Sequence, residues 1–315
     1  MSPAARHSST RNPQNHSLLD IESIAPDSIQ KLLKLARRME SVRRRPSTML
    51  RGKTVALLFY EASTRTRVSF ELAAKALGAT TILITASASS IEKGESLLDT
   101  VFTLRAAGAN IFVMRHPSSG APHLAAKHLD VPVINAGDGM HEHPSQALLD
   151  AMTMMRHKKK LGGLRVAIVG DILHSRVARS NVHLLRKCGA QVTLCGPPEL
   201  APELCTTLAP GVHLTRHLDE AIRGTDVVMM LRVQKERLAG LQLKVQDYIA
   251  GYQLTPERLK LAKRDVLVMH PGPIIRGMEL TAEVADGPQS VILEQVATGV
   301  PVRMAILAHA LGAAR

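Results

Sequence analysis

The chain has 315 residues, of which 45% are hydrophobic, and this length predicts two domains of ordinary size rather than one small core. No apolar run approaches the ~20 residues that a membrane-spanning helix needs, so we expect no membrane partner. The net charge of +13 fits a nucleic-acid partner or anionic substrates, but three Tyr, four Phe and no Trp are too few for a base-stacking surface, so we expect no nucleic acid.

The N-terminus and the cysteines both point to the cytoplasm. Residues 1–16 are polar and basic and lack the apolar segment of a secretory signal, so we expect a disordered tail. Cys188, Cys195 and Cys205 match no zinc-binding spacing and predict reduced thiols.

In the first half, apolar runs of strand length alternate with helical patterns, which predicts an α/β fold with mainly parallel sheets. An amphipathic helix is expected over 26–44, with Asp27 and Ser28 as candidate N-caps. The expected strands are 55–60, 80–85, 111–115 and 131–135, and the expected helices are 67–77, 96–106, 122–128 and 146–155. Lysines 158–160 and two glycines then favour a domain boundary.

The second half restarts the same alternation. The expected strands are 165–170, 191–196, 212–215, 227–231 and 266–269, and the expected helices are 175–188, 218–223 and 256–263. Two final helices, 289–298 and 301–311, are predicted to be separated at residues 299–301, with Pro301 in the first turn of the last one.

The run Glu-Ala-Ser-Thr-Arg-Thr-Arg at 61–67 lies where a predicted strand meets a predicted helix. Free N–H groups and the positive dipole end of a helix bind phosphate, and hydroxyls and guanidiniums add further donors. Capping alone requires one Ser or Thr. The run therefore predicts an anion pocket that includes Ser63, Thr64, Arg65 and Thr66.

Polar clusters also follow other predicted strands, where open α/β sheets place their ligands. They occupy 115–117, 135–146, 170–176, 232–237 and 270–276. The turn after residue 170 lacks the glycine spacing that binds a dinucleotide, so we expect no NAD.

Histidines follow the fourth predicted strand, but their spacing argues against a metal site. His141 and His143 are two residues apart, and no third ligand follows at helical spacing. His143 is better placed to donate a hydrogen bond to a substrate carbonyl, and Gln146 to hold an amide group. For His116, His123 and His128 we expect structural or surface positions.

The sequence contains no nucleophile elbow, catalytic Cys–His signature or Walker A motif. The arginines, hydroxyls, lysine and histidine that remain suit the binding of charged reactants and the stabilisation of a developing oxyanion.

From about residue 16 to its end, the chain resembles the aspartate/ornithine carbamoyltransferase family, and within it the enzymes that use aspartate. The resemblance rests on residues 59–67, Lys-Gly-Glu at 93–95, Met-Arg-His-Pro at 114–117, His-Pro-Ser-Gln at 143–146, Arg-Val-Gln-Lys-Glu-Arg at 232–237 and His-Pro-Gly-Pro at 270–273. It implies transfer of the carbamoyl group of carbamoyl phosphate to L-aspartate, giving N-carbamoyl-L-aspartate and phosphate, without metal or cofactor. This reaction is the committed step of pyrimidine biosynthesis.

The resemblance also implies an architecture. Residues 17–150 would form a carbamoyl-phosphate-binding domain, 151–290 an aspartate-binding domain, and 291–315 a C-terminal helix that packs on the first domain. The family forms homotrimers whose active sites are shared between subunits. Whether a regulatory chain or a dihydroorotase-type partner joins the trimer is left open.

Residue roles follow from the matching motif positions. Ser63, Thr64, Arg65 and Thr66 would hold the phosphate, Arg115 would bridge phosphate and carbonyl oxygen, His143 would polarise that oxygen, and Gln146 would hold the carbamoyl NH₂. Ser89 and Lys93 would come from a neighbouring subunit. Aspartate would be bound by Lys93, Arg176, Arg232, Gln234, Gly272 and Pro273, while Glu61, Glu236 and Arg237 would brace the two domains.

Two alternatives and two departures, at Gly272 and at residues 274–277, accompany this interpretation. Ornithine would require an acidic group in the second domain, where the chain offers Arg232 and Gln234 instead. An inactive scaffold should have lost one of the phosphate or carbonyl groups, and all are present. Gly272 stands where some relatives carry Leu, so any contact there must come from its backbone carbonyl. The role of Arg276 stays open.

Overall fold

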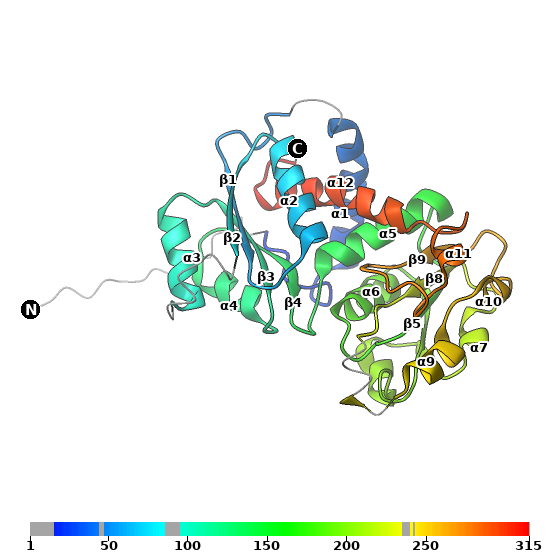
Figure 1. The fold of residues 1–315 in the computed structure, drawn as a ribbon. Coiled ribbons are helices and arrows are strands. Elements are labelled where there is room, and N and C mark those ends of the chain that lie inside the picture. Colours follow the sequence, from blue (N-terminus) through cyan, green and yellow to red (C-terminus); the bar gives the residue numbers. More distant parts are fainter. Residues whose placement is uncertain (1–15, 44–46, 86–94, 235–239, 242, 315) are drawn as a thin grey trace, which may run out of the picture.

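The computed structural model describes residues 16–43, 47–85, 95–234, 240–241 and 243–314. The first half contains a four-stranded sheet in the order β2-β1-β3-β4, and its neighbouring strands all pair in parallel. These strands are β1 (Thr54–Phe59), β2 (Thr80–Thr85), β3 (Ile111–His116) and β4 (Val133–Asp138). The predicted α/β fold with mainly parallel sheets is confirmed (Figure 1).

The helices of this half are α1 (Pro26–Val42), α2 (Thr64–Ala76), α3 (Leu97–Ala106) and α4 (Ala121–His128). Helix α2 begins at Thr64, with Ser63 as its N-cap, so the predicted anion-binding run forms the first turn of the helix. The N-cap of α1 is Ala25, so the prediction that Asp27 or Ser28 caps it was wrong. Pro26 occupies the first helical position, where its missing N–H costs no hydrogen bond.

The second half contains a five-stranded parallel sheet in the order β7-β6-β5-β8-β9. Its strands are β5 (Arg165–Val169), β6 (Gln191–Cys195), β7 (Val212–Thr215), β8 (Val227–Met230) and β9 (Leu267–Met269). Its helices are α6 (Arg176–Lys187), the 3₁₀ helix η3 (Glu203–Leu208), α7 (Leu218–Ile222), α9 (Val245–Tyr252), α10 (Pro256–Leu259) and α11 (Ala282–Ala285). The sequence analysis did not predict η3, α9 or α11.

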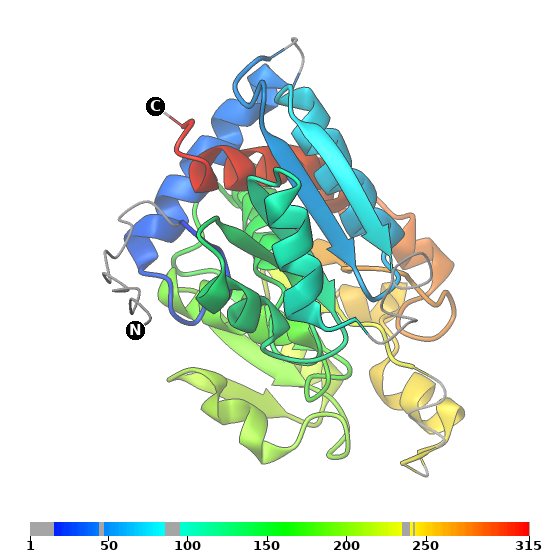
Figure 2. The ribbon, with the colours of Figure 1, turned by 90° about the vertical axis from the view of Figure 1, so that its left-hand side faces the viewer.

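Two helices join the halves: α5 (Pro144–Lys158) and α12 (Ile292–Ala310). The predicted break of the last helix was wrong, because α12 is continuous and contains Pro301 in its interior. A proline removes only one helical hydrogen bond, and residues 298–308 of α12 are buried, so packing keeps the helix intact. Helix α12 lies against α1, α2 and α5 (Figure 1, Figure 2).

One continuous apolar core runs through both halves. It contains Leu57 of β1 and Ile168 of β5, and it is bridged by side chains of α5 and α12 such as Leu148 and Met304. Helix α5 runs through residue 150, where the sequence analysis placed the boundary between the two domains. Among the described residues, we find no helix with the length and apolar character to cross a membrane.

Candidate functional site

A cavity of about 840 Å³ lies between the two sheets, and residues that follow strands of both halves line it. It brings together the following residues that the sequence analysis singled out: Glu61, Ser63, Thr64, Arg65, Thr66, Arg115, His143 and Gln146 from the first half, and Arg176, Arg232, Gln234, Gly272 and Pro273 from the second. Ser89, Lys93, Glu236 and Arg237 lie outside the described residues.

The first turn of α2 forms one wall of this cavity. The Ser63 side chain makes no capping hydrogen bond, so its hydroxyl is not needed to start the helix. Burial and the nearby Arg232 lower the pKa of Arg65, although an arginine stays charged at neutral pH. Arg65 belongs to the first half and Arg232 to the second, and their mutual repulsion marks a region of positive potential.

Glu61 links two arginines across the cavity. Its carboxylate accepts from Arg115 Nη2 at 2.5 Å and from Arg176 Nη1 and Nη2 at 3.0 and 2.5 Å. Burial raises the pKa of Glu61, but the hydrogen bond and charge of Arg176, together with those of Arg115, outweigh it and hold the pKa below its usual value. Burial and the neighbouring Arg176 lower the pKa of Arg115 to about 10. Arg115 belongs to β3 in the first half and Arg176 begins α6 in the second, so the ion pairs that Glu61 makes with both arginines join the two halves.

His143 is held in the turn between β4 and α5. Its backbone N–H donates to Ser180 Oγ at 2.8 Å, and Ser180 in turn donates to Glu142 Oε2 at 2.8 Å. Its ring Nε2 lies 3.4 Å from Thr66 Oγ1. Burial, followed by the charges of Arg115, Arg176 and Arg303, lowers the pKa of His143 well below its usual value. The imidazole is therefore neutral at physiological pH and retains one N–H donor.

Asp150 is the centre of a buried network that the sequence analysis missed. Its Oδ1 accepts from Gln146 Nε2 at 2.9 Å and from Gln295 Nε2 at 2.8 Å, and its Oδ2 accepts from Asn181 Nδ2 at 2.9 Å. The Gln295 Oε1 accepts the backbone N–H of His270 at 2.9 Å. Burial raises the pKa of Asp150 to about 6. The sequence shows an acidic residue between the apolar residues Leu149 and Ala151 of a predicted helix, but two of its hydrogen-bond partners, Asn181 and Gln295, are distant in the chain.

Arg303 is a second residue that sequence reasoning did not find. It projects from α12 into the cavity lining, and its guanidinium carbon lies 5.1 Å from the centre of the Phe70 ring. Burial lowers its pKa to about 9. A buried arginine stacked on an aromatic ring adds positive charge to the cavity floor.

The wall contributed by the second half is less enclosed. Arg232 is exposed and Gln234 is partly exposed after the end of β8, whereas His270 is buried after β9. Burial, together with Arg65 and Arg232, lowers the pKa of His270 to about 3. Asp171 also lines the cavity, and its Oδ1 pairs with His174 Nδ1 at 2.8 Å.

Gly272 lies close to the guanidinium of Arg65. Its φ is +68°, and a Cβ atom there would lie 2.8 Å from the guanidinium carbon of Arg65. A leucine in this conformation would displace Arg65, which gives a physical reason for the departure seen in the sequence. Gly272 donates its N–H to His270 Nδ1 at 2.7 Å.

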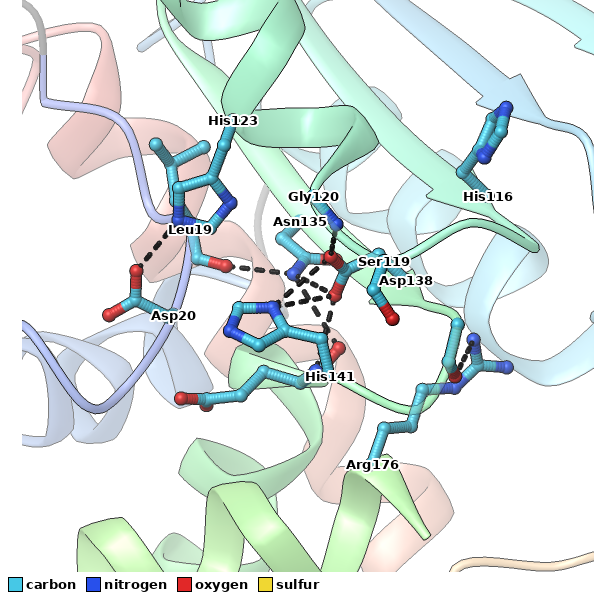
Figure 3. A network of polar contacts seen from close by, with 12 residues as sticks. Leu19, Asp20, His116, Ser119, Gly120, His123, Asn135, Asp138, His141 and Arg176 are labelled. Carbon is cyan, nitrogen blue, oxygen red and sulfur yellow. Dashed lines mark hydrogen bonds and ion pairs between the residues drawn. The ribbon is translucent and has the colours of Figure 1, made fainter. Parts of the chain in front are cut away.

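Two groups of described side chains have the composition and spacing of metal ligands, and neither lines the cavity. They are His123 with Asp138 and His141, and Glu22 with Glu142 and His183. Figure 3 shows the first group together with Asp20 and Asn135.

Comparisons with known proteins agree with this arrangement. The carbamoyl-P binding domain of the aspartate/ornithine carbamoyltransferases matches residues 16–156, and their Asp/Orn binding domain matches residues 162–310. The aspartate carbamoyltransferase catalytic subunits of Koribacter versatilis and Syntrophobacter fumaroxidans are 67% and 55% identical, covering 94% and 92% of this chain and 97% and 96% of their own lengths.

Solved structures show the same likeness. Aspartate transcarbamoylase from Trypanosoma cruzi, in complex with carbamoyl aspartate and phosphate, has a TM-score of 0.84 at 34% identity, over 93% of this chain and 95% of that one. Ornithine carbamoyltransferase from Pyrococcus furiosus has a TM-score of 0.86 at 28% identity, over 95% of this chain and 97% of that one. The fold is thus shared by enzymes with different amino-acid substrates, and the lining residues must decide between them.

Proposed function

This chain belongs to the aspartate/ornithine carbamoyltransferase family, and we propose that its cavity transfers the carbamoyl group of carbamoyl phosphate to the amine of L-aspartate. The products are N-carbamoyl-L-aspartate and phosphate, and the reaction serves pyrimidine biosynthesis. The single observation that carries the proposal is that both walls are cationic: Arg65 and Arg115 of the first half and Arg176 and Arg232 of the second line one cavity. Such a cavity suits two anionic reactants.

Carbamoyl phosphate would bind at the first wall. Ser63, Thr64 and Thr66 supply hydroxyl and backbone donors at the start of α2, and Arg65 supplies a charged fork for the phosphate. These groups also stabilise the negative charge that the phosphate gains as it leaves. Because the helix fixes the backbone donors before the reaction, they need little reorganisation in the transition state.

The carbonyl oxygen would be polarised by Arg115 and His143. A neutral imidazole can donate one N–H to this oxygen, and the low pKa of His143 keeps the ring in that form. The aspartate nitrogen attacks the carbonyl carbon, and the C–O bond to phosphate breaks. The phosphate leaves with that electron pair, and it accepts the proton that the nitrogen loses. Gln146, whose amide is oriented by Asp150, would hold the carbamoyl NH₂.

Aspartate would bind at the second wall, to Arg176, Arg232 and Gln234. Arg176 already donates to Glu61 and to the Gly139 carbonyl, the latter at 3.3 Å, so a substrate carboxylate must share this guanidinium with Glu61 or displace it. Pro273 and the backbone of Gly272 would complete the wall.

Ornithine is the alternative acceptor, and the presence of the acidic residue Asp171 in the cavity lining would favour it. This acid lines the second wall, but its carboxylate is paired with His174. The exposed cation Arg232 on the same wall repels a second cation. Aspartate therefore fits the charge of the wall better than ornithine does.

For the assembly we propose a cytoplasmic homotrimer with active sites shared between subunits. Ser89 and Lys93 would enter the cavity from the neighbour, with Lys93 neutralising phosphate and contacting aspartate. Residues 17–150 and 151–290 would be the two substrate domains, with 291–315 packed on the first, and Glu61, Glu236 and Arg237 would brace them.

If sites are shared, mixing inactive Lys93→Gln and Arg115→Ala chains should restore part of the activity. Mixed trimers without recovery would contradict sharing.

The function is tested by supplying carbamoyl phosphate with L-aspartate and, in parallel, with L-ornithine. Both phosphate and the ureido product are quantified. We expect product with aspartate only. Product with ornithine would assign the second wall to a cationic acceptor, and no product with either from folded protein would indicate an inactive relative.

A further inference from the structure

We propose that His123, Asp138 and His141 form a binding site for a divalent transition-metal ion such as Zn²⁺, outside the substrate cavity. A ring nitrogen from each histidine and a carboxylate oxygen of Asp138 lie within 4.8 Å of one another. Two imidazoles and one carboxylate are a ligand set typical of zinc. The site depends on neither substrate, so it stands apart from the proposed function.

The three ligands come from separate elements. His123 is on α4, Asp138 ends β4, and His141 lies in the turn that leads to α5 (Figure 3). This explains why sequence spacing argued against a metal: only His141 belonged to the histidine pair considered there. The histidine side chains keep 38% and 30% of their surface exposed, so the site lies near the protein surface.

His123 is oriented as a metal-binding histidine usually is. Its Nε2 lies 2.9 Å from Asp20 Oδ2, whereas its Nδ1 is buried and has no hydrogen-bond partner. Figure 3 shows this nitrogen on the side of the ring that faces Asp138. Metal-ligating histidines commonly pair their second nitrogen with a carboxylate, which fixes the ring and raises its basicity.

Asp138 is a rigid partner. It is fully buried, and its two oxygens accept from the backbone of Gly120 at 2.7 Å, from Asn135 Nδ2 at 2.7 Å and from the backbone of Glu142 at 3.2 Å. Its Oδ2 lies 3.1 Å from His141 Nδ1. A metal ion would replace the proton shared in this last contact, while the other bonds keep the carboxylate in place.

The simpler explanation is a polar network that needs no ion. The His141–Asp138 pair satisfies both of those groups, but it leaves the buried Nδ1 of His123 without a partner. The second group of potential ligands is less suitable. Its Glu142 carboxylate already accepts from the backbone of Ile21 and Glu22 and from Ser180.

An ion at this site would tie α4 to the turn that serves the cavity. The Gly139 carbonyl in this turn accepts from Arg176, and the Met140 carbonyl accepts from Arg179, each at 3.3 Å. His143 follows His141 by two residues. Metal binding should therefore stabilise the protein against heat, because the ion binds the folded turn and not the unfolded chain.

The test is an equilibrium titration of the full-length protein with Zn²⁺. Cysteines and other histidines also bind zinc, so the informative quantity is the difference between variants. His123→Ala should bind one equivalent fewer than wild type and lose the thermal stabilisation by zinc. His128→Ala removes an exposed histidine from the same helix and should behave as wild type. Asp20→Asn should weaken binding roughly 10- to 100-fold.

A crystal grown with Zn²⁺ locates the ion directly, and an anomalous peak between His123 and His141 is expected. Equal zinc stoichiometry and affinity in wild type and His123→Ala, or a peak only at other residues, would overturn the proposal. Without metal, the thermal transition and carbamoyl transfer of His123→Ala should match wild type, which controls for misfolding. Loss of zinc binding with transfer intact separates this site from the proposed function.

Discussion

The two walls of the cavity are built to different degrees of rigidity. In the first wall, Arg115, His143 and Gln146 are at least 91% buried, and each has hydrogen-bond partners within the protein. In the second wall, Arg232 is exposed and Gln234 is half-buried, next to residues 235–239 outside the described part. The groups assigned to the reacting carbonyl are thus the preorganised ones, whereas Thr64 and Arg65, assigned to the leaving phosphate, are exposed. Chemistry that depends on fixed dipoles needs such rigidity, whereas an acceptor that enters and leaves does not.

The largest effect is expected from a substitution that removes a cation from the first wall. Arg65→Ala should lower kcat roughly 100- to 1000-fold, the loss typical when a charge-stabilising donor is removed. Arg67→Ala is the matched control, because Arg67 belongs to the same run but does not line the cavity. Steady-state kinetics would measure both. A near-normal rate in Arg65→Ala would refute the phosphate pocket.

The second prediction concerns pH and the buried Asp150. Its pKa rises from 3.8 to about 6 on folding, so the folded state holds the proton more tightly than the unfolded state. The protonated carboxyl therefore stabilises the folded state below pH 4. This contribution to the free energy of unfolding, roughly 3 kcal/mol, is lost as the pH rises to about 6. The free energy of unfolding of wild type, relative to Asp150→Asn, should fall over this interval. Parallel pH profiles from urea denaturation would contradict the assignment.

An effect of intermediate size is expected when the ion pairs between the two walls are weakened. Glu61→Gln removes the charge that holds Arg115 and Arg176 together, and charged hydrogen bonds contribute about 1.5–3 kcal/mol. We expect kcat/KM for aspartate to fall roughly 10- to 100-fold, while the protein stays folded. Glu71→Gln removes a surface carboxylate paired with Lys75 and should leave the kinetics unchanged. If both variants behave alike, Glu61 does not couple the walls.

The smallest effect is expected at Gly272. Gly272→Ala combines a strained backbone with a contact against Arg65, whereas Gly277→Ala has a similar positive φ but open space around its Cβ. Both variants should lose about 1–2 kcal/mol of stability from the left-handed backbone. Only Gly272→Ala should also raise the KM for carbamoyl phosphate, because it moves Arg65. An equal KM in both would show that Arg65 does not depend on this contact.

Sequence patterns predicted elements best where local chemistry dominated. Strands β2 and β7 match their predicted bounds, and the polar run at 61–67 was correctly placed where a strand leads into a helix. The pattern failed at Pro301, because burial of the surrounding turn outweighed the local preference for a break. Short elements such as α11 have too few residues for a periodic signal.

The sequence by itself determined the fold class, because alternating strand and helix patterns admit few other packings, and it determined most of the polar groups that the cavity collects. Only the tertiary structure decided which distant groups meet. The bond from Gln295 to Asp150, the contact of Arg303 with Phe70 and the approach of His123 to Asp138 join residues that are 145, 233 and 15 positions apart. Such contacts depend on how helices pack on the sheets, and no local pattern encodes that geometry.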